Sequence, residues 1–145
     1  MKSVTRILSV LVITISLYAC GENRSKNFTT EPEKAFELWT GVPPRDDVKV
    51  KHGKYMQQTA GNTKEYVVYL EMQIPHELRD NFLKALDVVK ATEYRHPDKA
   101  PDWFNPGKDW QIWKPATKEG VRELVCLEDS ASGRFMLFDF NTIKQ

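Results

Sequence analysis

The stretch Tyr66-Val67-Val68-Tyr69-Leu70-Glu71-Met72-Gln73-Ile74 shows the clearest strand pattern in this 145-residue sequence. Apolar side chains occupy every second position from Val68 to Ile74, and the positions between them carry Tyr69, Glu71 and Gln73. Because successive side chains of a strand point to opposite faces, this alternation predicts a half-buried β-strand. The fold is therefore expected to centre on a sheet with one strongly apolar face.

A second strand with the same alternation precedes this stretch. Residues Val48–His52 place apolar and polar side chains in turn, and Thr59–Thr63 has the small and polar composition of a turn. Two alternating stretches joined by such a segment predict an antiparallel hairpin.

A further hairpin is expected near the C-terminus. Residues Val121–Glu128 and Arg134–Phe140 flank the turn-like segment Asp129–Gly133. Both faces of Arg134–Phe140 are largely apolar, which predicts a central position in the sheet. Trp110–Trp113 is a candidate short strand that ends before Pro115.

Two helices are expected, one before the first of these strands along the chain and one after the second. The first begins near Pro32, which suits a first helical turn, and ends at Gly41. The second follows Pro75 and is expected to end near Ala91. Its apolar stripe recurs at helical spacing, and consists of Leu78, Phe82, Ala85, Leu86 and Val89.

The order of these elements predicts an α+β domain over residues 30–145. We expect an antiparallel sheet of about four or five strands, with a short N-terminal helix and one longer amphipathic helix packed mainly on one face. The 126 residues from Cys20 to the last residue suffice for one domain with one core.

A long segment between the second helix and the last strands is rich in aromatic residues. Thr92–Gly107 lacks periodicity, and loops of this length are more often functional than average. Large rings with polar edges anchor protein interfaces and stack on sugars, but they can equally pack the loop onto the sheet. The candidate recognition residues are Tyr94, Arg95, His96, Trp103, Phe104, Trp110 and Trp113.

Charge and motif content exclude several classes of function. The chain has 21 basic and 20 acidic residues, a formal net charge of +1, which gives no basis for nucleic-acid binding. His52, His76 and His96 match no metal-binding spacing, so we expect no metal or other cofactor. Cys126 lies in an apolar stretch and is expected to pack as a small hydrophobic residue. No nucleophile elbow or phosphate loop is found, so no catalytic residue is assigned.

The N-terminus has the three parts of a secretory signal peptide. Lys2 and Arg6 precede the apolar run Ile7–Leu17, which is too short for a transmembrane span. The run ends in Leu17-Tyr18-Ala19-Cys20. Cleavage before Cys20 would remove Lys2 and Arg6 and so change the formal charge from +1 to −1.

The ending Leu17-Tyr18-Ala19-Cys20 resembles the lipobox of bacterial lipoproteins, with Tyr18 larger than the residue usual there. The resemblance implies a signal peptide at 1–19, a diacylglycerol and an acyl chain on Cys20, and a membrane anchor. Gly21 at the following position implies the outer membrane, facing the periplasm. Gly21–Thr29 is mainly polar and lacks periodicity, and over residues 20–29 we expect a lipidated N-terminus followed by a flexible spacer.

The sequence leaves three hypotheses for function. The first is a lipid-anchored, non-enzymatic module that binds an envelope protein or cell-wall partner. The others are an immunity-type lipoprotein that neutralises a periplasmic toxin, and a small cell-wall or lipid hydrolase that uses His96 and a loop carboxylate. Gly41–Pro44, Pro101–Phe104 and Ser132–Arg134 resemble stretches of small bacterial lipoproteins, a resemblance that implies no activity.

Overall fold

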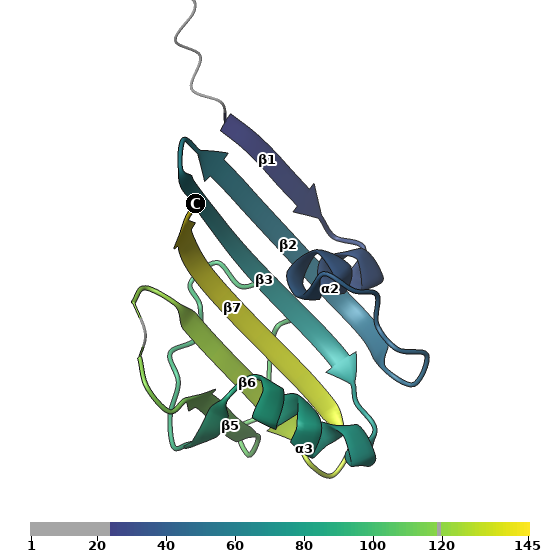
Figure 1. Cartoon of the computed structure of the whole chain (residues 1–145). Coiled ribbons are helices and arrows are strands. Elements are labelled where there is room, and N and C mark those ends of the chain that lie inside the picture. The colour runs from purple at the N-terminus through teal and green to yellow at the C-terminus, as the bar shows by residue number, and fades with distance from the viewer. Residues whose placement is uncertain (1–23, 119) are drawn as a thin grey trace, which may run out of the picture.

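The structure, a computed structural model, describes residues 24–118 and 120–145, so the leader and Cys20 lie outside the described residues. Nine helices and strands follow one another in this part of the chain (Figure 1). They are β1 (Arg24–Thr29), α2 (Pro32–Thr40), β2 (Lys49–Ala60), β3 (Thr63–Gln73), α3 (His76–Ala85), β4 (Val88–Ala91), β5 (Gln111–Pro115), β6 (Glu123–Asp129) and β7 (Arg134–Lys144).

The described strands form one seven-stranded antiparallel sheet in the order β1-β2-β3-β7-β6-β5-β4. The β2–β3 and β6–β7 hairpins were both predicted and are confirmed. Strand β7 pairs with β3 on one side and β6 on the other, which confirms its predicted central position. Helix α2 spans Pro32–Thr40, and Gly41, with a φ of 81°, ends it as predicted.

The predicted fold class is wrong. The described residues contain seven strands and two short helices, so the domain is mostly β, and neither the four or five strands nor the longer helix of the α+β prediction is found. The discrepancy comes from two segments that the sequence pattern assigned to other structures, one before Pro32 and one after Ala85.

The first of these segments is strand β1. The sequence predicted a flexible spacer up to Thr29, but Arg24–Thr29 pairs with the outer edge of β2, from Arg24 opposite Ala60 to Thr29 opposite Tyr55. Strand pairing uses backbone hydrogen bonds, so a polar segment can add to an exposed edge without an apolar stripe. The ordered domain therefore begins six residues before residue 30, the predicted boundary.

The second segment follows helix α3. The predicted helix ends at Ala85, and Asp87 adopts a φ of 52°, which a continuing helix does not allow. The next residues, Val88–Ala91, pair with β5 as strand β4. Ala85 and Val89, which were predicted on the buried stripe, are exposed, and Leu83 is the buried residue of this helix.

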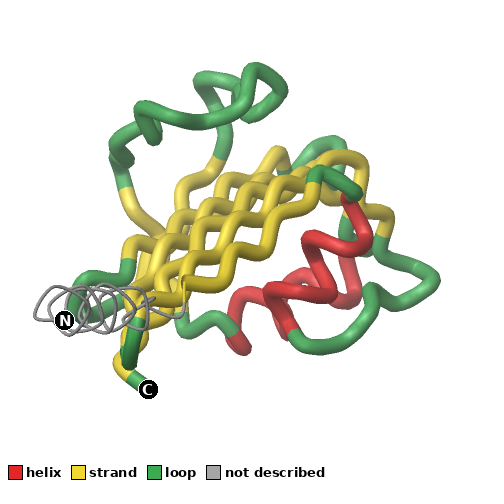
Figure 2. Tube along the Cα trace, turned by 90° about the horizontal axis from the view of Figure 1, so that it is seen from above, coloured by secondary structure: helices red, strands yellow, loops and turns green. Residues whose placement is uncertain are grey.

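The two faces of the sheet carry different coverings. Figure 2 shows both described helices on one face and the long loop after β4 on the other. On the helix face, Phe36 of α2 and Leu83 of α3 pack against Leu70, Leu137 and their neighbours. Gly53 of β2 lets α2 approach, because a Cβ there would lie 2.8 Å from the Cβ of Ala35.

A buried carboxylate lies on the helix face of the central strand. Asp139 is 0% exposed, and Arg122 donates two hydrogen bonds to its oxygens at 3.0 and 2.9 Å. Trp39 of α2 and Tyr66 of β3 donate two more, at 2.9 and 3.1 Å. Burial, followed by the charge of Asp139, raises the pKa of Tyr66 to about 12. The network joins α2, β3 and β7 around one charge.

Candidate functional site: a groove beside the aromatic loop

A row of apolar side chains crosses the loop-covered face of the sheet. Strand register places Phe28 opposite Met56, Met56 opposite Val67, and Val67 opposite Phe140. We call these four residues the apolar row. Adjacent strands lie about 4.8 Å apart, so the row extends over about 14 Å. Glu123 of β6 stands opposite Phe140 and ends the row with a carboxylate.

The long loop covers the neighbouring part of this face and covers the apolar row only in part, since Phe28 is exposed while Met56, Val67 and Phe140 are half-buried. Phe104, which is 1% exposed, packs edge-on against Tyr69, with 5.4 Å between ring centroids. Tyr69 in turn contacts Phe138 on β7 at 5.1 Å. Tyr69 and Phe138 lie two residues along their strands from Val67 and Phe140 of the apolar row. The outermost member of that row, Phe28, is 60% exposed.

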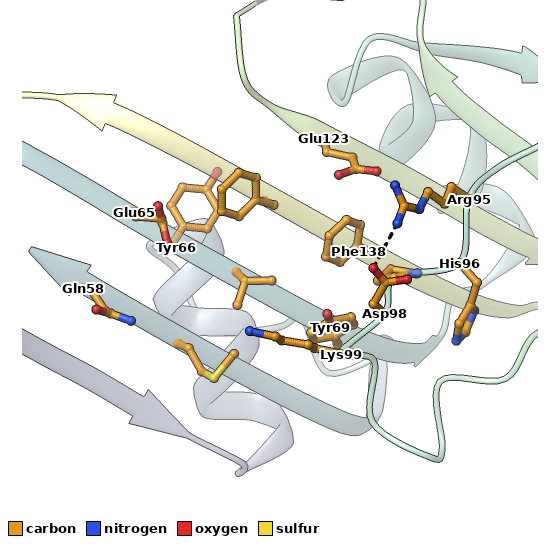
Figure 3. A pocket seen from close by; sticks show the side chains of 14 residues that line it. Gln58, Glu65, Tyr66, Tyr69, Arg95, His96, Asp98, Lys99, Glu123 and Phe138 are labelled. Carbon is orange, nitrogen blue, oxygen red and sulfur yellow. Dashed lines mark hydrogen bonds and ion pairs between the residues drawn. The ribbon is translucent and has the colours of Figure 1, made fainter.

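A groove of about 480 Å³ lies where the loop meets this incompletely covered part of the sheet. Its floor is apolar, and includes Met56, Val67, Tyr69, Phe138 and Phe140. Charged side chains stand around it (Figure 3), namely Glu65 and Glu123 from the strands and Arg95, Asp98 and Lys99 from the loop. An ion pair of 2.9 Å joins Arg95 to Asp98. An apolar floor with a polar rim is the usual composition of a binding site.

A buried glutamate connects the loop to the sheet beside the groove. Glu71 is buried on β3, and it accepts hydrogen bonds from Arg134 at 2.8 Å and from His52 at 2.9 Å. The His52 ring stacks on Trp103 at 5.2 Å, and Arg134 lies over the Trp110 ring at 5.1 Å. Both loop tryptophans are therefore positioned by the partners of one carboxylate.

The same contacts set the acidity of Glu71. Burial raises the pKa of this carboxyl, but the hydrogen bonds from Arg134 and His52 and their charges outweigh burial and lower it below its ordinary value. A lowered pKa means that the unfolded chain binds this proton more readily than the folded one. The carboxylate therefore stabilises the fold above the unfolded pKa of about 4.3, and this contribution is lost as the pH falls through the folded pKa.

Glu71→Gln should make the acid limb of stability shallower. Between about pH 5 and pH 3, the urea midpoint of the wild type should fall more steeply than that of the variant, because the variant has no carboxylate to protonate at position 71. Urea unfolding followed by tryptophan fluorescence across this pH range measures the difference. Glu77→Gln, at an exposed carboxylate of α3, is the matched control and should keep the wild-type slope. An unchanged slope in Glu71→Gln would refute the assignment.

The structure divides the seven candidate recognition residues into three groups. Arg95 and His96 line the groove. Tyr94, Trp103, Phe104 and Trp110 pack the loop against the sheet. Trp113 lies on the opposite face, where its ring nitrogen donates a hydrogen bond to Glu128 at 3.1 Å.

The candidate acid–base groups have structural partners. Nδ1 of His96 lies 3.4 Å from the hydroxyl of Tyr94, and the loop carboxylate Asp98 is paired with Arg95. Within residues 24–118 and 120–145, no three histidine, cysteine or acidic side chains could together hold a metal ion. Cys126 is fully buried in the core, as predicted, and burial raises the pKa of its thiol.

The apolar row, of which Met56, Val67 and Phe140 also belong to the groove floor, was not identified from the sequence. Phe28 was placed in a spacer, and Met56 lay outside the predicted strands. The alternation along Tyr66–Ile74 puts Val67 on the face of Tyr69, and that of the last strand puts Phe140 with Phe138. What the alternation does not provide is the register that aligns these residues.

In the described part of the chain, no helix has both the length and the apolar character needed to cross a membrane. Comparison of the chain with protein-family models, with curated proteins and with solved structures returned no match.

Proposed function

We propose that this protein is a lipid-anchored component of the bacterial cell envelope whose β-sheet domain binds a protein partner through the groove and the adjoining apolar row. The anchor is proposed from the resemblance of Leu17–Cys20 to a lipobox, and Gly21 favours the outer membrane, facing the periplasm. Two acyl chains are sufficient for stable attachment to a bilayer.

The observation that supports binding is the incompletely covered apolar row. A folded domain gains free energy by covering apolar side chains, and the loop covers Tyr69 and Phe138 but leaves Phe28 exposed. Contiguous apolar surface with a polar rim marks interaction sites in soluble domains. The row lies on strands β1, β2, β3 and β7, which give it a rigid support.

The composition of the rim favours a protein ligand over a small charged molecule. Both signs of charge surround the floor, with Glu65 and Glu123 opposed by Arg95 and Lys99. Mixed charges around an apolar centre are typical of protein interfaces, where charge complementarity selects the partner. We therefore expect a partner that inserts an apolar side chain over Met56 and Val67.

Phe28→Glu should weaken partner binding at least about tenfold, because it replaces the most exposed ring of the apolar row with a charge that the partner's apolar surface would have to desolvate. The matched control is Asn27→Glu, which makes the same charge change one residue earlier on β1 and on the other face. Both side chains are exposed, so neither substitution should disturb the fold.

The measurement has two stages. A photo-crosslinking amino acid at position 28 or 27 of the full chain first identifies the partner in cells. The affinity of the purified partner is then determined for the wild type, Phe28→Glu and Asn27→Glu. Crosslinking at position 28 alone, together with weaker binding of Phe28→Glu alone, supports the proposal. Equal crosslinking at both positions, or equal affinity of the two variants, contradicts it.

A further inference from the structure

We infer that the end of the sheet at which β1 begins rests on the anionic surface of the bilayer, so that the strands stand on the membrane. This inference rests on the lipid anchor of the proposed function and adds the orientation of the domain. The docking end consists of the first three residues of β1 (24–26), residues 60–65 in and beside the β2–β3 turn, and the last residues of β7, Ile143 and Lys144.

These segments lie together at one end of the molecule. Register places Arg24 opposite Ala60, and Thr63 opposite Lys144. The backbone N–H of Gln145 donates a hydrogen bond of 2.7 Å to the carbonyl of Asn62. Figure 1 shows the start of β1, the β2–β3 turn and the C-terminus at the same end, opposite α3 and the β6–β7 turn.

The length of chain between the anchor and the sheet brings this end to the membrane. Strand β1 begins at Arg24, four residues after Cys20. An extended chain advances at most about 3.6 Å per residue, so the sheet begins within about 14 Å of the anchored sulfur. A long spacer would let the domain tumble freely, but a segment this short limits which surface can face the bilayer.

The side chains at the docking end suit an anionic lipid surface. Lys26, Lys64 and Lys144 belong to it, and Ile143 adds an apolar side chain that is 41% exposed. Glu65 reduces the net charge but leaves it positive. Basic residues close to a membrane are attracted by anionic headgroups, and the attraction falls off within a Debye length, about 8 Å in physiological salt.

The opposite end of the sheet has a different character. Exposed carboxylates surround it, and Arg45 and Arg79 there are held in ion pairs with two of them, at 3.1 and 3.2 Å. With Lys49 exposed there as well, the charges of this end nearly balance, so it has no excess of positive charge that would attract an anionic surface. The carboxylates belong to Asp46, Asp47, Glu77 and Asp80.

The test measures which end lies next to lipid. Full-length lipidated protein carrying Asn62→Cys is labelled with a fluorophore and placed in vesicles of phosphatidylglycerol and phosphatidylcholine that contain a headgroup quencher. The matched control is Ser130→Cys, in the exposed turn at the opposite end, and the buried thiol of Cys126 does not compete for the label. Quenching at position 62 and none at position 130 is expected, and equal quenching would overturn the inference.

Two further variants separate a docking surface from a short tether. Inserting about 20 glycine and serine residues before Arg24 adds about 25 Å of flexible chain, and quenching at position 62 should persist if the surface itself binds lipid. Lys26→Gln, Lys64→Gln and Lys144→Gln together should abolish it in the lengthened protein, whereas the control Lys49→Gln, Lys84→Gln and Lys108→Gln should not. Docking would be contradicted if the longer tether by itself removed the quenching at position 62. It would also be contradicted if the two triple variants had equal effects.

The anchor itself is checked separately by the intact mass. A protein without acyl groups on Cys20 would refute the anchor of the proposed function. A lipidated protein without selective quenching would refute only the orientation, and would leave the groove and its partner unaffected.

Discussion

Arg122→Leu should destabilise the protein by about 3 kcal/mol, because it leaves the fully buried carboxylate of Asp139 without a positive partner. Breaking a buried ion pair costs about 3–5 kcal/mol. The lower end applies here, since the Arg122 side chain is itself 38% exposed and Trp39 and Tyr66 continue to donate hydrogen bonds to the carboxylate. This loss is a large part of the roughly 5–15 kcal/mol that holds a domain of this kind together.

Urea unfolding of the variant and the wild type measures the effect. The double variant Arg122→Leu with Asp139→Asn should be more stable than Arg122→Leu alone, because asparagine keeps an oxygen acceptor and removes the buried charge. Arg95→Leu is the surface control, since its ion pair with Asp98 is exposed and should contribute little. If Arg122→Leu and Arg95→Leu lost the same stability, the buried network would not have the role described.

Strands whose side chains must be buried on a defined face could be predicted from the sequence. Tyr66–Ile74 has one consistently apolar face, and Arg134–Phe140 is apolar on both faces, because Val68 and Leu137 pack under the helices while Tyr69 and Phe138 pack under the loop. Burial selects the residue type at every second position, so the pattern records the strand. The turn Asp129–Gly133 and the end of α2 at Gly41 were predictable for a related reason, since their backbone conformations favour particular residues.

Strands β1 and β4 were not predictable because backbone pairing, rather than burial, holds them in the sheet. Arg24–Thr29 has mainly polar side chains, and its partner is an edge that exists only after β2 has formed. Val89 continued the predicted stripe of α3 in sequence, and the left-handed conformation of Asp87 was needed to end the helix. Aspartate adopts this conformation more readily than most residues, but local sequence does not require it.

The groove depends on two facts that no local pattern contains. The first is register, which aligns Phe28, Met56, Val67 and Phe140 from four strands. The second is the part of the face that the loop covers. Trp113 shows the same limit, because nearness in sequence grouped it with the loop, whereas strand alternation puts Ile112 on the loop face and Trp113 on the other.

Phe104→Ala should destabilise the protein by about 3–4 kcal/mol and release the loop from the sheet. The side chain is 1% exposed, and truncation of a buried phenylalanine to alanine costs about 3–5 kcal/mol in lost burial and a cavity. The loop has no strand or helix of its own, so this ring and its contact with Tyr69 supply much of what orders it. Trypsin should then cleave after Arg95 or Lys99 at a urea concentration where the wild type is intact.

A comparison with Trp110→Ala separates packing from recognition within the loop. Trp110 is half-buried beneath Arg134, so its truncation should cost less stability than that of Phe104 and leave the loop protected. Lys99→Ala, on the rim of the groove, should leave stability unchanged and weaken only partner binding. Urea midpoints and limited proteolysis of the three variants measure this order. If Lys99→Ala and Phe104→Ala exposed the loop equally, then Phe104 would not be its anchor, because a rim lysine contributes no buried surface that holds the loop to the sheet.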